Sequence, residues 1–200
     1  GSNNIKAVYV DEQKSLVYIG THAGGLTVLH RNSGKMESFN QLNSQLVNEN
    51  VYAILPDKGG NLLLGTLSAL VSFNPEKKSF TTIDKEKDGT PFTSQRITIL
   101  FRDSHKRLWV GGEEGISVFQ QEGIEIEKVP ILPESSVTKT FTNCIYEAAN
   151  GIIWVGTREG FYCFNEKEKK IKRYTTANGL PNNVVYGILE DTFGRLWVST

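Results

Sequence analysis

Five near-copies of one short segment, repeated roughly every 45 residues, predict an all-β fold built as a β-propeller. The copies cover residues 14–21, 60–66, 106–112, 151–157 and 194–200. Their anchor residues are 45, 46, 45 and 43 positions apart: Gly20, Gly65, Gly111, Gly156 and Ser199. Strands that are apolar on both faces and a turn at the same place in the copies support the prediction. Each repeat has the size of one four-stranded propeller blade.

The first half of each unit is predicted as a tight hairpin. Its first strand is apolar throughout, at residues 51–55, 97–101 and 185–189, as in strands that are covered on both faces. The turn Asp57-Lys58-Gly59-Gly60 follows the first of these. Asp can accept hydrogen bonds from the backbone ahead of it, and Gly adopts positive φ readily. The second strand, of the type Leu-Trp-Val-Gly-Thr, is rich in β-branched and aromatic residues.

The second half of each unit is a weaker hairpin. Its third strand ends on an apolar anchor: Leu29, Phe73, Phe119 or Phe164. The positions seven and ten residues after each anchor are all apolar or aromatic, although the intervening turns are highly charged. These positions are Met36 and Phe39, Phe80 and Ile83, Ile126 and Val129, Ile171 and Tyr174. Because stacked sheets need bulk on both faces, Trp109, Trp154 and Trp197 are predicted to pack between blades.

These elements predict four complete blades, at residues 4–39, 47–83, 96–129 and 142–174, and the first hairpin of a fifth at 184–200. The half-blade leaves an open edge. Either the chain is a fragment of a longer array, which we favour, or another chain completes the blade. Cys144 and Cys163 fall two strands apart in one sheet, about 9.5 Å between backbones. Since a disulfide reaches only about 7 Å, free thiols are predicted.

Composition excludes several partners. The chain has 22 basic and 22 acidic residues, so its zero net charge does not favour nucleic acid or a membrane surface. It has neither a run of about 18 apolar residues nor a signal peptide, so no direct membrane contact by this segment is expected. His22, His30 and His105 fall in different units without Cys or carboxylate at ligand spacing. We therefore expect neither a metal site nor a cofactor.

Residues 179–200, which run from Gly-Leu-Pro-Asn-Asn-Val to Gly-Arg-Leu-Trp-Val-Ser-Thr, resemble the two-component regulator propeller repeat. That pattern is approximately Leu-Pro-x-Asn-x-Val-x-x-Ile-x-x-Asp-x-x-Gly-x-Leu-Trp-Val-Gly-Thr-x-x-Gly-Leu-x-x-Phe. The resemblance covers nearly all of the chain. The departures are local: Ser199 replaces the Gly, Ala148 the turn Asp and Lys106 the turn Gly, and the first unit has an extra residue on each side of Gly20.

The resemblance implies a function and a setting. Such repeats typically form paired seven-bladed propellers in the extracytoplasmic sensor region of hybrid two-component regulators of Bacteroidetes, many of which respond to oligosaccharides. An immunoglobulin-like domain, a membrane helix and a histidine kinase follow in the family. The chain is thus expected to be part of one seven-bladed, ligand-sensing propeller in the periplasm, within an inner-membrane protein that regulates transcription. Its expected partners are an oligosaccharide, further blades of the parent chain and, as a possibility that we keep open, a second copy in a homodimer.

The candidate ligand site lies on one face of the blades, where the loops after the second strands and the linkers between blades meet. The linkers, residues 40–50, 84–96, 130–141 and 175–184, exceed the usual two to six residues. Long loops on a rigid scaffold commonly hold recognition residues. Amide, guanidinium and carboxylate groups there suit the hydroxyls and acidic groups of a neutral or acidic oligosaccharide. The candidate residues are His22, Asn50, Arg96, Glu113, Glu114, Asn143, Arg158, Glu159 and Asn183.

Catalysis is not expected. A glycosidase needs paired carboxylates at a fixed separation, whereas the adjacent Glu113 and Glu114 point to opposite sides if extended. The sequence carries neither a nucleophile elbow nor a phosphate loop. Two alternatives to a sensor stay open: a fragment of a propeller lyase or glycoside hydrolase, and a protein-interaction scaffold.

Overall fold

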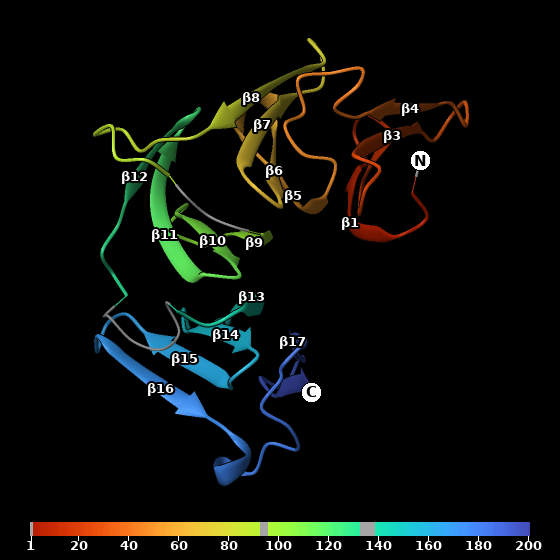
Figure 1. Ribbon diagram of the computed structural model, residues 1–200. Coiled ribbons are helices and arrows are strands. Elements are labelled where there is room, and N and C mark those ends of the chain that lie inside the picture. Colours follow the sequence, from red (N-terminus) through yellow and green to blue (C-terminus); the bar gives the residue numbers. More distant parts are fainter. Residues whose placement is uncertain (1, 93–95, 133–138) are drawn as a thin grey trace. The chain divides into compact units, whose positions relative to one another are not determined.

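The computed structural model describes residues 2–92, 96–132 and 139–200. It consists mainly of antiparallel strands, each paired with the strand next to it in the chain (Figure 1). Four sheets have four strands in chain order, and a fifth has two. The chain is therefore an all-β propeller fold, as predicted.

The strands of the first two sheets are β1 (Ile5–Asp11), β2 (Leu16–Thr21), β3 (Leu26–His30), β4 (Met36–Phe39), β5 (Val51–Pro56), β6 (Leu62–Thr66), β7 (Leu70–Asn74) and β8 (Ser79–Ile83). Those of the third and fourth are β9 (Ile97–Arg102), β10 (Leu108–Gly112), β11 (Gly115–Glu122), β12 (Glu125–Lys128), β13 (Thr142–Glu147), β14 (Ile153–Thr157), β15 (Phe161–Asn165) and β16 (Lys170–Tyr174). The last sheet pairs β17 (Gly187–Glu190) with β18 (Leu196–Ser199), and two short 3-10 helices are η1 (Lys58–Gly60) and η3 (Thr176–Asn178).

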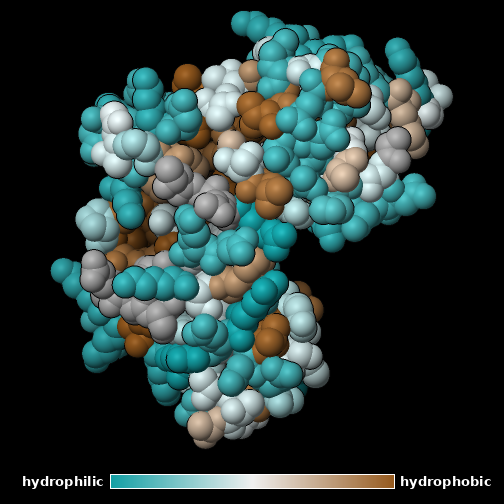
Figure 2. Space-filling model, in the orientation of Figure 1, coloured by the Kyte–Doolittle hydropathy of each residue, from teal (hydrophilic) through white to brown (hydrophobic). Residues whose placement is uncertain are grey.

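The chain divides into two compact units. The first unit comprises Gly1–Leu100 and Gln121–Ile126, and the second comprises Phe101–Gln120 and Glu127–Thr200. Each contains blades packed face to face. Figure 2 shows that hydrophilic side chains cover most of the visible face, with apolar side chains in small separate groups.

In the first unit, apolar side chains of the first two sheets form one core. Tyr18 and Phe39 of the first sheet pack with Leu64 and Phe73 of the second, and all four are buried. The ring centroids of Phe39 and Phe73 are 5.4 Å apart, and those of Phe73 and Phe80 are 4.5 Å apart. Both faces of these sheets need apolar residues because each sheet is covered by a neighbour.

In the second unit, Trp109 of β10 is fully buried and packs with Val155, Tyr162 and Phe164 of the next blade. The prediction that this indole lies between blades is confirmed. Trp154 is half-buried and stacks on Phe161 of its own sheet, with ring centroids 4.8 Å apart.

Trp197 departs from the prediction. Its side chain is 60% exposed, so the prediction that it packs between blades is wrong for this chain. The physical reason is that, within the described residues, β17 rather than β18 is the strand of this two-stranded sheet that packs on the preceding blade, and Trp197 lies in β18.

The repeated glycine of the second strand is explained by close approach between blades. A β-carbon added at Gly65 would lie 2.7 Å from the carbonyl oxygen of Ile97, the first residue of the next blade. One added at Gly20 would lie 2.8 Å from Val51, and one at Gly156 would lie 2.7 Å from Val185. Because real β-carbons do not approach so closely, only glycine lets the blades pack at this distance.

The predicted spacing of seven and ten residues after each third-strand anchor matches the pairing of the third strand with the fourth. Leu29 pairs with Met36, Phe73 with Phe80, and Phe164 with Ile171, each seven residues on. The residue ten positions after each anchor pairs with the residue three positions before that anchor. The two apolar residues of the fourth strand are therefore three positions apart and lie on opposite faces of the sheet. Met36 is nevertheless 63% exposed, because it lies in the outermost strand of its sheet.

The two cysteines are free, as predicted. Cys144 lies in β13 and Cys163 in β15, and β14 runs between these strands. Burial raises the pKa of the Cys144 thiol to about 11.

Candidate ligand-binding face

The loops after the second strands lie beside the residue that precedes the first strand of the same blade. The backbone N–H of His22 donates to Asn4 O at 2.9 Å, and the N–H of Leu67 donates to Asn50 O at 3.2 Å. In the fourth blade, Arg158 N–H donates to Phe141 O at 3.1 Å. We call the surface formed by these loops and entry residues the loop face. Each unit has its own part of it.

A β-bulge follows each of these entries. The register shifts between Ile5 and Ala7, between Val51 and Ala53, and between Thr142 and Cys144. The extra residues are Lys6, Tyr52 and Asn143, and their side chains are exposed or half-buried, whereas Val51 beside Tyr52 is fully buried. Bulges commonly redirect a side chain next to a functional site.

In the first unit, three side chains from successive blades meet on the loop face. The Tyr52 hydroxyl lies 3.5 Å from His22 Nδ1, at the outer limit of hydrogen-bond distance. The Arg96 guanidinium carbon lies 5.8 Å from the centroid of the Tyr52 ring. Arg96 has a positive φ of 48°, which non-glycine residues adopt seldom, and its N–H donates to Leu67 O at 2.8 Å.

Asn50 joins this region to its own linker. Its Oδ1 accepts a hydrogen bond from the N–H of Ala23 at 3.1 Å, and its Nδ2 donates to Asn48 Oδ1 at 3.0 Å. The side chain therefore fixes the loop of the first blade against the entry of the second. The structure thus brings His22, Asn50 and Arg96 into one region of the first unit.

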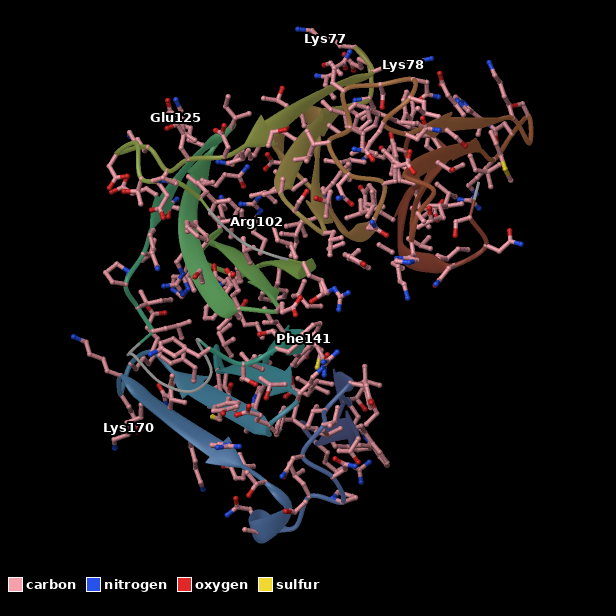
Figure 3. All side chains as sticks on the ribbon, in the orientation of Figure 1. Lys77, Lys78, Arg102, Glu125, Phe141 and Lys170 are labelled. Carbon is pink, nitrogen blue, oxygen red and sulfur yellow. The ribbon has the colours of Figure 1, made fainter. Side chains whose placement is uncertain are left out.

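In the second unit, the guanidinium of Arg158 lies over an aromatic ring. Its guanidinium carbon is 4.0 Å from the centroid of the Phe141 ring. Figure 3 shows Phe141 at the start of β13, and Lys170 at the start of β16 on the opposite edge of the same sheet. Arg158 is exposed and Phe141 is half-buried.

The acidic candidates differ in their surroundings. The backbone oxygen of Glu159 accepts hydrogen bonds from Nε and Nη2 of Arg173, and the carboxylate of Glu159 lies 4.0 Å from Arg173 Nη2. Glu113 and Glu114 form the exposed turn between β10 and β11. Glu159 is thus directed toward β16 rather than toward Arg158.

The side chains of Asn143 and Asn183 form hydrogen bonds with backbone groups. Asn143 Nδ2 donates to Val185 O at 2.9 Å, and Asn183 Oδ1 accepts from Thr176 N–H at 2.8 Å. In the structural register, Phe141 and not Asn143 corresponds to Asn50 and Arg96. The ligand-binding role of all nine candidates stays a prediction.

Sequence reasoning missed Tyr52 and Phe141, which supply the aromatic rings of the loop face. Tyr52 is the extra residue of its bulge, whereas Phe141 is the entry residue that precedes Thr142, two positions before the Asn143 that the sequence suggested. The signal that could have found them is the buried first residue of each strand: Tyr52 follows Val51, and Phe141 precedes Thr142.

Parts of two predicted linkers, residues 93–95 and 133–138, lie outside the described residues.

A second concavity lies at the turn end of the second unit. It has a volume of about 580 Å³ and is lined in part by His105, Asn150 and Glu166. Both carboxylate oxygens of Glu166 accept hydrogen bonds from Arg107 at 2.7 Å. Hydrogen bonding to Arg107 lowers the pKa of Glu166, and bonding to Glu166 raises the pKa of Arg107. Arg107 Nε also donates to Asp103 Oδ2 at 2.6 Å, so one guanidinium bridges two carboxylates.

Within residues 2–92, 96–132 and 139–200, no group of three or more His, Cys, Asp or Glu side chains could hold a metal ion. In the same residues, no helix is long and apolar enough to cross a membrane.

Four-stranded antiparallel sheets with one repeated hairpin register, joined within each unit by linkers that end beside the loops after the second strands, define a β-propeller built from tandem repeats. Part of the chain matches a model of the two-component regulator propeller family. The family model described as two component regulator propeller matches residues 135–159 and 179–200.

Three known proteins are similar to the chain. Histidine kinase P4 of Formosa agariphila is 29% identical over 168 residues, which are 80% of this chain and 12% of that protein. The extracellular domain of a putative one-component system from B. thetaiotaomicron has a TM-score of 0.80 at 20% identity, over 100% of this chain and 26% of that one. An ancestral GH74 enzyme has a TM-score of 0.69 at 17% identity, over 98% of this chain and 27% of that one. The two structures show the fold alone.

Proposed function

We propose that the chain is the ligand-sensing propeller segment of a two-component sensor of the hybrid type, and that its loop face recognises oligosaccharides outside the cytoplasm. A histidine kinase outside this chain would receive the signal. The observation that carries the proposal is that a half-buried aromatic ring lies beside a guanidinium on the loop face of each unit, Tyr52 with Arg96 in the first and Phe141 with Arg158 in the second.

The chemistry of this face fits a saccharide. A sugar ring offers an apolar face that can pack on an aromatic ring, and hydroxyls that bond to guanidinium, imidazole and amide groups. Side chains fixed by backbone hydrogen bonds lose little conformational entropy on binding, which favours affinity. The loop entry of each blade provides such fixed positions.

The relatives support the sensor setting. One is named a histidine kinase, and another structure is described as an extracellular domain of a putative one-component system. This chain spans 12% of the kinase and 26% of the extracellular domain, so the activity of a whole protein is part of the proposal. Signalling requires that the ligand bind two arrangements of the sensor with different affinity.

A glycan panel tests the proposal by measuring both binding and cleavage. We expect at least one oligosaccharide to bind without turnover, and Arg96→Ala or Arg158→Ala to weaken that binding. If the chain binds an oligosaccharide and neither substitution weakens it, the loop face is the wrong place. If it binds none, the proposed ligand class is wrong.

A hydrolase fragment is the second candidate, because the ancestral GH74 enzyme shares the fold. Detectable cleavage of any glycan in the same panel would favour it. A protein-interaction scaffold would be favoured if no glycan shifted the melting temperature while a partner protein did.

A further inference from the structure

We propose that Arg158, held over the ring of Phe141, is an anion-binding subsite that selects saccharides carrying a carboxylate or a sulfate ester. This inference rests on the proposed function and narrows its ligand class. It assigns Phe141 a role as the positioning residue for the guanidinium.

The geometry fixes the guanidinium from two sides. The backbone N–H of Arg158 donates to Phe141 O at 3.1 Å, so the loop after β14 is tied to the entry of β13. The guanidinium carbon then lies 4.0 Å from the centroid of the Phe141 ring. A cation over an aromatic face is attracted by the ring quadrupole, and the contact leaves the N–H groups at the edge of the plane available.

Nothing described competes for these N–H groups. Among residues 2–92, 96–132 and 139–200, the Arg158 side chain has neither a hydrogen bond nor an ion pair. The neighbouring acid, Glu159, is directed toward Arg173, which donates to its backbone oxygen and lies 4.0 Å from its carboxylate. Arg158 is exposed, so an incoming anion can reach it.

The chemistry of the guanidinium selects the ligand. Its planar fork matches two oxygens of a carboxylate or a sulfate, and bidentate pairs of this kind are stronger than neutral hydrogen bonds. A neutral sugar hydroxyl cannot use the charge. Because the aromatic ring fixes the fork in advance, less rotamer entropy is lost when the anion binds.

The pair is specific to one blade. At the same two register positions, the first blade has Asn4 and His22, and the second has Asn50 and Leu67. Among these three blades, only the fourth has an aromatic residue, Phe141, at the entry position together with a cation, Arg158, at the loop position. The subsite is therefore expected to read one substituent of a longer ligand.

The experiment compares matched charged and neutral probes on the full chain by calorimetry. Oligogalacturonate and oligomannuronate are each paired with their carboxyl-reduced form, and a carrageenan oligosaccharide with its desulfated form. We expect at least one charged probe to bind tenfold or more tightly than its neutral partner. The pair that shows the difference identifies carboxylate or sulfate as the group bound.

Four variants locate the effect. Arg158→Ala is expected to weaken binding of the charged probe about tenfold to a hundredfold, and Arg158→Lys to recover only part of it because the fork is lost. Phe141→Ala is expected to weaken it severalfold, with recovery in Phe141→Tyr, which keeps the ring. Melting curves exclude unfolding as the cause. Lys172→Ala is the control: it removes one positive charge that lies 4.6 Å from the ring of Tyr174 in β16, the strand at the opposite edge of the sheet from β13.

The outcomes separate this inference from the proposed function. Binding of neutral probes alone, or charged-probe binding that Arg158→Ala leaves unchanged, overturns the subsite and leaves oligosaccharide recognition standing. An equal loss in Lys172→Ala also overturns it, since the effect would then be overall charge. Absence of binding to every saccharide overturns both.

Discussion

At the scale of single residues, a turn carboxylate organises two hairpins of the second unit. Asp103 Oδ1 accepts from the Arg107 backbone at 2.8 Å, while Oδ2 accepts from Arg107 Nε at 2.6 Å and Trp109 Nε1 at 2.8 Å. Asp191 makes the same three hydrogen bonds, to Arg195 and Trp197. Desolvation acts to raise the pKa of Asp191, but these hydrogen bonds outweigh it and lower the pKa to about 2.

The fourth blade shows what replaces this carboxylate when it is missing. Ala148 stands in the turn, and the hairpin still closes, because Ala148 N–H donates to Ile152 O at 2.9 Å. Asn150 Oδ1 accepts from the Ile152 N–H at 3.1 Å, which is the bond that the Asp forms in the neighbouring blades. Trp154 lacks the Asp partner and stacks on Phe161 instead.

The two tryptophans with equal hydrogen bonds and unequal burial give a matched pair of substitutions. Trp109→Ala is expected to lower the free energy of unfolding by about 3–5 kcal/mol, because the indole is fully buried. Trp197→Ala loses the same kind of hydrogen bond on a side chain that is 60% exposed, so about 1 kcal/mol or less is expected. Denaturant titration measures both, and similar losses would contradict the role assigned to burial.

Lys106 offers a stabilising substitution. It stands at the turn position where Gly60, Gly151 and Gly194 have positive φ, and its own φ is 64°. Because a side chain in this region is strained, Lys106→Gly is expected to raise the free energy of unfolding by about 0.5–1 kcal/mol. The backbone bond from Lys106 N–H to Asp103 O is retained. Lys106→Ala, which keeps the strain, is the control, and an equal gain in it would contradict the explanation.

At the scale of elements, the blades are held by contacts from the first hairpin of one blade, through its turn and its second strand, to the first strand of the next. Glu147 of the fourth blade accepts from Ser104 N–H at 2.7 Å and from its hydroxyl at 2.6 Å. Glu190 of the half-blade accepts from Ala149 N–H at 3.3 Å, at the same place of the repeat. Together with the glycine approach, these bonds fix neighbouring blades in one register.

Gly65→Ala tests the close approach between blades. The added methyl group would lie 2.7 Å from Ile97 O and 3.1 Å from Ala53 Cβ, and rigid strands hold both atoms. We expect a loss of about 2–3 kcal/mol in the free energy of unfolding. Gly123→Ala is the control, since Gly123 has a positive φ but nothing within 4 Å. If the loss at Gly65 does not exceed that at Gly123, the steric explanation is wrong.

The strands and their order followed from the sequence, whereas the site did so only in part. Repetition made the strands predictable, because a pattern that recurs five times averages out local ambiguity. The hairpin register was also predictable, as Phe73 and Phe80 illustrate. Tyr52 was not, because it is the extra residue of a bulge, which strand patterns do not encode. Phe141 was not, because the sequence placed the strand entry two residues later, at Asn143. Exposure of Trp197 depends on what covers its sheet, which its own sequence does not state.

At the scale of the whole molecule, charge and exposed apolar area decide how the chain behaves in solution. The formal net charge is zero at pH 7, so copies do not repel each other there. Several apolar side chains of the half-blade region are largely exposed: Tyr186 66%, Leu189 63%, Phe193 81% and Trp197 60%. Low repulsion combined with such a surface favours self-association.

Solubility measured against pH is therefore expected to be lowest near pH 7 and higher at pH 5 and pH 9, where the net charge is not zero. A Leu189→Lys, Phe193→Lys double variant is expected to raise solubility at pH 7 severalfold. Asn32→Lys with Gln45→Lys adds the same charge at exposed polar positions and is the control. Precipitation by polyethylene glycol measures all three chains. The half-blade pair should exceed the control because it removes apolar area as well as adding charge; equal solubility of the two double variants would assign the effect to charge alone.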